Sequence, residues 1–178
     1  PAELTGMLSW KQFALFADER LKENSPRRST LRLLRLSFLN LAAVEELTNI
    51  EVASAALARA LRLIDQTVRP PSASCCVYGL QILILAEAGE ADRITMRIRR
   101  LLERIQIADI TPQLSLPGAR LGELLKAGLR IASADYPRDG VTINELAQRT
   151  REIVHTSLEK QALEKQASIK EVANAGNW

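Results

Sequence analysis

Four arginines recur at intervals of four, three and four residues in the stretch DRITMRIRRLLERIQ, residues 92–106. On a helix that turns by about 100° per residue, Arg93, Arg97, Arg100 and Arg104 fall within a sector about 60° wide. Guanidinium groups in a row neutralise phosphates without reading bases. The spacing therefore predicts a surface for a polyanion, with nucleic acid (RNA or DNA) as the leading interpretation.

The same helix offers a simpler explanation for its arginines. Apolar side chains occupy the neighbouring sector, and burying that sector would push the arginine row to the surface without any partner. These apolar residues are Ile94, Ile98, Leu101, Leu102 and Ile105. A solvated face is thus one alternative, and an acidic protein or a lipid surface is another.

A second basic row is expected further upstream. Arg28, Arg32 and Arg35 repeat the spacing of four and then three, which gives one line if this segment is a continuous helix. Two such rows side by side would suit a phosphate backbone. Because only 4% of the residues are aromatic, stacking on bases would contribute little, and sequence specificity would be poor.

Residues for catalysis or metal binding do not gather in any recognisable pattern. His155, the single histidine, has no cysteine or carboxylate at ligand spacing, so no metal site and no cofactor are expected. Cys75 and Cys76 are adjacent in sequence, which disfavours a disulfide between them. Both are expected to be buried packing residues. Free thiols fit a reducing, intracellular compartment, cytoplasmic or nuclear. The segment LPGARLGE lacks the pattern of a phosphate-binding loop. The chain is therefore predicted not to be an enzyme.

The composition favours packed helices. Of 178 residues, 47% are hydrophobic and 25% are charged, and the formal net charge is only +3. With so few aromatic residues, the core must consist of Leu, Ile, Val and Ala. The longest apolar run, residues 77–86, is too short for a membrane span of about 20 residues.

Helical spacing and capping signals divide the chain into elements. Helix caps are expected at Ser9 with Gln12, at Thr48 with Glu51 or at Asn49 alone, and at Thr142 with Glu145, which is the clearest capping box. Residues 72–89 are predicted to form a central buried helix, with a strand at LQILIL as the competing interpretation. Gly122 and Gly128 are expected to mark close contacts between helices.

These patterns predict an all-α fold, a single compact bundle of about six or seven helices. Residues 1–157 would form the helical domain, and residues 158–178 a helical arm or tail. The arm repeats LEKQA, a five-residue unit that drifts around a helix instead of keeping one apolar stripe.

The leading functional hypothesis is a non-catalytic assembly protein that self-associates through its last helix and presents arginine rows to nucleic acid. A viral nucleocapsid or matrix component, or a nucleic-acid-associated bacterial factor, would fit this description. The alternative is an adaptor or regulator that binds a protein partner through its C-terminal helix, with arginines that only solvate the surface. Both hypotheses include a homo-oligomer or a protein partner and no membrane span.

Overall fold

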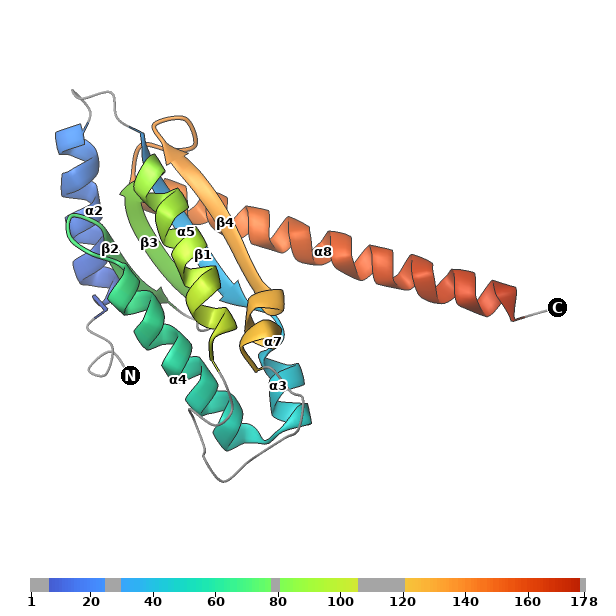
Figure 1. Ribbon diagram of the computed structural model, residues 1–178. Helices are drawn as coiled ribbons and strands as arrows, with labels where there is room; N and C mark the ends of the chain where they lie inside the picture. The colour runs from blue at the N-terminus through green and yellow to red at the C-terminus, as the bar shows by residue number, and fades with distance from the viewer. Residues whose placement is uncertain (1–6, 25–29, 78–80, 106–120, 177–178) are drawn as a thin grey trace.

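The computed structural model describes residues 7–24, 30–77, 81–105 and 121–176. Helices and strands are interspersed along the chain (Figure 1). The elements are α2 (Trp10–Asn24), β1 (Leu31–Phe38), α3 (Leu41–Leu47), α4 (Ile50–Thr67), β2 (Ala73–Val77), β3 (Gln81–Glu87), α5 (Ala88–Glu103), α7 (Leu121–Gly128), β4 (Leu129–Tyr136) and α8 (Ile143–Ala175). The fold is therefore mixed α/β.

The prediction of an all-α bundle is wrong, and the error falls on three segments. The segment of Arg28, Arg32 and Arg35, expected to be helical, contains β1. Residues 72–89, expected to form one buried helix, contain β2 and β3. Residues 119–134, expected to form the helix that carries Gly122 and Gly128, contain α7 and most of β4. The competing interpretation of a strand at LQILIL was the right one. Short runs of leucine and isoleucine that are buried on both sides have no periodicity, so pattern alone does not separate strand from helix.

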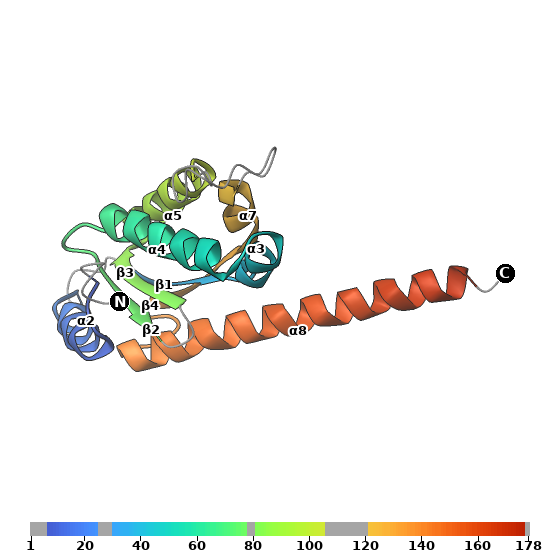
Figure 2. The ribbon, with the colours of Figure 1, turned by 90° about the horizontal axis from the view of Figure 1, so that it is seen from below.

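The strands form one antiparallel sheet in the order β2-β3-β1-β4. In the register, Leu34 of β1 lies opposite Ile84 of β3 and Ser133 of β4. Helices cover both faces, with α4, α5 and α7 on one side and α2 and α8 on the other (Figure 2). Two separate apolar clusters fill these two interfaces. Because both faces are buried, β3 is apolar except at its two ends, and β1 is apolar except for Arg32, Arg35 and Ser37.

Several helix signals are confirmed. The Asn49 side chain caps α4 by accepting a hydrogen bond from the amide of Val52. Thr142 and Glu145 form the expected capping box at the start of α8. The carboxylate of Asp18 in α2 also accepts a bond of 3.0 Å from the amide of Ile143, which ties the two helices of this face together.

Helix α8 begins against the sheet and then leaves it (Figure 1). Its buried residues all lie in its first eight positions, Ile143 to Thr150, and every residue from 155 to 176 is exposed. Within the described ranges, no helix combines the length and the apolar character that a membrane crossing requires.

Arg32 on β1 joins the sheet to the helical layer above it. Its guanidinium group donates to Asp135 of β4 at 2.7 Å and to Asp92 of α5 at 2.9 Å. The hydrogen bond to Asp135 is the main reason why the pKa of Arg32 is raised. These contacts fix the first turns of α5 over the centre of the sheet.

Gly122 allows α7 to pack closely against the end of α5. A Cβ atom at this position would overlap the main-chain oxygen of Leu102 and would lie 2.7 Å from that of Glu103. We expect Gly122→Ala to lower the free energy of unfolding by about 1–3 kcal/mol, although alanine is the better helix former. Urea denaturation measures the change.

Gly89 provides the matched control, because a Cβ atom there meets nothing within 4 Å. Gly89→Ala should leave stability unchanged or raise it by up to about 1 kcal/mol. Equal effects of the two substitutions would show that the close contact at Gly122 is not important for stability.

Candidate functional site

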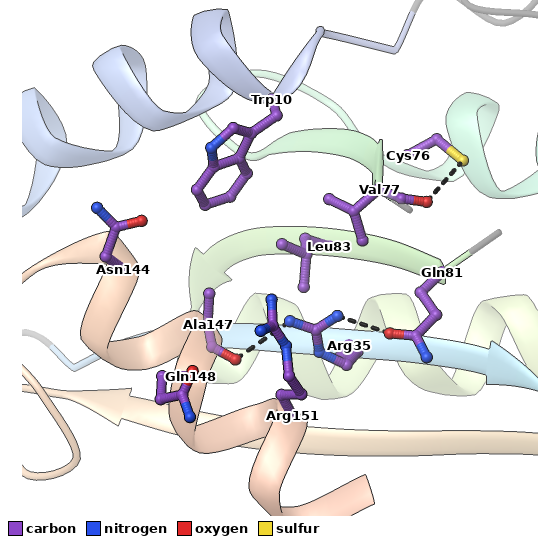
Figure 3. A pocket seen from close by; sticks show the side chains of 10 residues that line it. All are labelled: Trp10, Arg35, Cys76, Val77, Gln81, Leu83, Asn144, Ala147, Gln148 and Arg151. Carbon is purple, nitrogen blue, oxygen red and sulfur yellow. Dashed lines mark hydrogen bonds between the residues drawn. The ribbon is translucent and has the colours of Figure 1, made fainter. Parts of the chain in front are cut away.

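A cleft of about 810 Å³ opens on the face of the sheet that α2 and α8 cover (Figure 3). Its walls come from the start of α2, the first turns of α8 and the strands between them. The lining residues are Trp10, Arg35, Cys76, Val77, Gln81, Leu83, Asn144, Ala147, Gln148 and Arg151. The volume falls within the range of about 300–1,000 Å³ that is usual for small-molecule sites.

Arg35 lies at the floor of this cleft and is only 3% exposed. Side chains alternate along β1, so Arg35 points toward α8 whereas Arg32 points toward α5. Its guanidinium group donates to Thr150 Oγ1 at 3.0 Å, to Gln81 Oε1 at 2.6 Å and to the carbonyl oxygen of Ala147 at 3.1 Å. A guanidinium group has five N–H donors, and these bonds use three of them; the other two have no hydrogen-bond acceptor among the described residues.

All three of these acceptors are neutral, and no ion pair of Arg35 is found among the described residues. Burial lowers the pKa of Arg35, and the positive charge of Arg151 lowers it further. Figure 3 shows the two guanidinium groups side by side at the base of the hollow. Buried charges in proteins are normally paired. The cleft thus holds uncompensated positive charge, which favours an anion.

Trp10 lies across the hollow from the arginines (Figure 3). It is the first residue of α2, its side chain is partly exposed, and its ring lies 6.1 Å from that of buried Phe13. Asn144 and Gln148, one helical turn apart on α8, add amide donors and acceptors to the wall. An aromatic face, amides and two guanidinium groups are what a nucleotide requires for its base and its phosphates.

The two cysteines do not supply a nucleophile. Cys75 is fully buried, and burial raises its pKa to about 12. Burial also raises the pKa of Cys76, whose thiol lies near the carbonyl oxygen of Val77. Since the thiolate is the reactive form, burial lowers the reactivity of both side chains.

Within the parts of the chain that the structure describes, no three His, Cys, Asp or Glu side chains converge on a point where they could hold a metal ion. His155 is exposed on α8 and lies 3.1 Å from Glu159. The charged groups that the cleft itself offers to a ligand are therefore guanidinium groups.

The arginine row that the spacing predicted lies on α5. The helix buries Ala91, Ile94, Ile98 and Leu102, and the arginines line a shallow surface hollow of about 590 Å³. Arg93 is paired with Glu90 at 2.8 Å. That Arg93, Arg97, Arg100 and Arg104 contact an anion stays a prediction.

The second basic row does not exist as predicted. Arg32 and Arg35 lie on a strand and point to opposite faces of the sheet, one in ion pairs and the other in the cleft. Arg28 lies outside the described residues. The row assumed helical spacing in a segment that forms a strand.

Sequence reasoning did not identify most of the cleft. Five of the lining residues were not predicted as site residues: Trp10, Gln81, Asn144, Gln148 and Arg151. The run LRLLRLSF did contain one signal. If the run is treated as a strand, its central arginine, Arg35, falls on the same face as Leu31 and Leu33. A charged residue on an otherwise apolar face of a strand indicates a candidate site.

No protein-family model matches the sequence, and no curated protein matches it. Solved structures do match the fold. A sensory box/GGDEF family protein from Caulobacter crescentus aligns with a TM-score of 0.68 and 16% identity, over 89% of this chain and 97% of that one.

Two further matches carry functional names. The GGDEF domain of DgcB from Caulobacter crescentus, in complex with c-di-GMP, aligns with a TM-score of 0.61 and 13% identity over 88% of each chain. The active GGEEF domain of a diguanylate cyclase from Vibrio cholerae aligns with a TM-score of 0.63 and 11% identity, over 86% of this chain and 92% of that one. The chain has the fold of GGDEF domains. Neither string, GGDEF or GGEEF, occurs in its sequence.

These matches correct the functional hypotheses. The prediction of a non-catalytic helical assembly protein that binds nucleic acid is wrong, because the fold is the mixed α/β fold of GGDEF domains and not that of a helical nucleocapsid or matrix component. The prediction that the chain is not an enzyme is contradicted by the same fold, which a diguanylate cyclase shares.

Replacing Arg35 and replacing Arg32 of β1 by methionine should have different effects on the free energy of unfolding. Arg35→Met removes a buried charge that has no counterion, so the free energy of unfolding should stay the same or rise by about 1 kcal/mol. Arg32→Met leaves Asp135, whose side chain is 13% exposed, without its main partner and should cost about 2 kcal/mol.

Urea denaturation of both variants tests this contrast. A larger loss for Arg35→Met than for Arg32→Met would show that Arg35 serves stability and would remove the argument that its charge is kept for a ligand.

Proposed function

We propose that this chain is a domain of cyclic-di-GMP signalling that binds a guanine nucleotide, GTP or c-di-GMP, in the cleft around Arg35. The single observation that carries this proposal is the buried guanidinium group of Arg35, which has only neutral partners and a second arginine beside it. The fold supports the choice of nucleotide, since one structure of this fold was solved with c-di-GMP and another belongs to a diguanylate cyclase.

In this proposal the phosphates bind to Arg35 and Arg151. Guanidinium groups match phosphate oxygens in two-pronged hydrogen bonds, and the low exposure of Arg35 strengthens such bonds. Arg35 needs no rearrangement to bind, because Thr150 and Ala147 already hold it in place.

The guanine base would stack on Trp10. Asn144 and Gln148 lie where their amides can pair with the edge of the base, and Val77 and Leu83 supply an apolar wall. The start of α8 lies beside the cleft and adds the partial positive charge of a helix N-terminus.

If the domain turns over GTP, fixed guanidinium groups would supply the electrostatic stabilisation of the phosphates. Catalysis of phosphoryl transfer consists largely of positioning and of charge neutralisation, and both are within the capacity of Arg35 and Arg151.

Binding can be measured through the fluorescence of Trp10. The sequence has two tryptophans, so Trp178→Phe gives a background in which Trp10 is the only emitter. GTP and c-di-GMP should change the emission and saturate, and Arg35→Met should weaken binding about tenfold or more. Arg151→Gln should weaken it by a smaller factor, since Arg151 is exposed.

Arg149→Gln is the matched control, because Arg149 is exposed on the same helix, pairs with Glu152 at 3.6 Å and does not line the cleft. Calorimetry provides a readout that is independent of tryptophan. The proposal is wrong if neither nucleotide binds at about 1 mM, or if Arg35→Met binds as tightly as the unmodified chain.

Release of pyrophosphate from GTP should be followed in the same samples. Release that Arg35→Met abolishes and Arg149→Gln preserves would make Arg35 a catalytic residue. Release that persists in Arg35→Met would locate the reaction elsewhere in the chain.

A further inference from the structure

The second part of α8 packs against none of the other residues that the structure describes. All residues from 155 to 175 are helical and exposed, and the helix extends away from the domain (Figure 2). Isolated helices of this length are marginally stable in water unless an amphipathic face is packed. We call residues 155–175 the arm.

One face of the arm carries four apolar side chains and is interrupted by one lysine, Lys165, so the arm does keep a partial apolar stripe. Leu158, Ala162, Lys165, Ile169 and Val172 follow each other at intervals of four, three, four and three residues, and at about 100° per residue they fall within a sector about 80° wide. The larger side chains on this stripe are strongly exposed, at 40% for Leu158, 60% for Ile169 and 71% for Val172.

The apolar stripe continues onto the domain. A small hollow of about 70 Å³ lies at the root of the arm, where Ile153, Val154 and Leu158 of α8 meet Leu39. Leu39 is itself 37% exposed. Apolar side chains therefore recur from the end of β1 along the arm to Val172, with Lys165 as the one charged residue on the stripe.

Charged residues beside the stripe indicate which partner packs against it. Glu159 and Lys170 flank the same side of the stripe, about 100° and 120° from Leu158 around the helix. They lie near opposite ends of the arm. A second arm that runs in the opposite direction brings each Glu159 next to the Lys170 of the other copy.

We propose that the arm pairs in antiparallel orientation with the arm of a second copy of this chain. Ile169 of each copy then packs on Leu158 of the other, and Val172 of each reaches the hollow at the other's root. The two Glu159–Lys170 pairs flank the apolar contact on one side.

Lys165 distinguishes this arrangement from a parallel one. In the antiparallel pair Lys165 lies opposite Ala162, which is small enough for its aliphatic stem to pack while the ammonium group stays in water. A parallel pair in register would place the two Lys165 side chains against each other at a core position, and no ion pair would form beside the stripe.

Sedimentation velocity of the 178-residue chain, from about 5 to about 300 µM, tests the pairing. The mass should rise from 19.7 kDa toward twice that value with concentration. Glu159→Lys and Lys170→Glu should each weaken dimerisation about tenfold, because each places like charges opposite one another. The double variant, and an equimolar mixture of the two single variants, should restore it.

Lys160→Glu and Glu171→Lys are the matched controls, because they make the same charge changes about 200° and 220° from Leu158 around the helix. Neither should alter the dimer. The proposal is overturned if the unmodified chain stays monomeric throughout the concentration range. It is also overturned if the single variants dimerise normally, or if the double variant and the mixture stay monomeric.

Discussion

The buried charge of Arg35 is the constraint around which this face of the molecule is organised. Three neutral acceptors hold the guanidinium group, and two of them, Thr150 and the carbonyl group of Ala147, belong to α8. The side chain that the cleft presents to a ligand is thus held in place by α8. Arg151, one turn further along α8, adds a second positive charge where the first is already destabilised by burial. Such an arrangement lowers stability unless an anion binds. In our proposal, the positive charge of Arg35 is therefore kept because it binds an anion.

The contrast with Arg32 shows how one strand supports two different roles. Arg32 has carboxylate partners on α5 and β4, and these contacts join the layers of the fold. Arg35, three residues later and on the opposite face, has none. Helix α8 then links two surfaces, because its first turns form a wall of the cleft while its last turns form the exposed arm.

Much of the helical structure was predictable from the sequence. The cap at Asn49, the capping box at Thr142 and the amphipathic arginine helix are local signals, and local hydrogen bonds decide them.

The sheet was not predictable in the same way. Its central strands are buried on both faces, so β1 and β3 have neither the alternation of a half-exposed strand nor a polar stripe. The cleft could not be assembled without the sheet, because Trp10, Gln81 and Arg151 are far apart in the sequence and meet only across it. The arginine at position 35 was noticed, but the helical interpretation assigned it to a surface row.

The most direct measurement of the central claim is an NMR titration that resolves the Nε–Hε signals of the arginines, with GTP and with c-di-GMP in turn. Our account predicts that the signals of Arg35 and Arg151 shift and saturate together with at least one of the two nucleotides, while that of Arg32 does not move. Shifts confined to the α5 arginines, or no shift at Arg35 at saturating concentrations of both nucleotides, would contradict it.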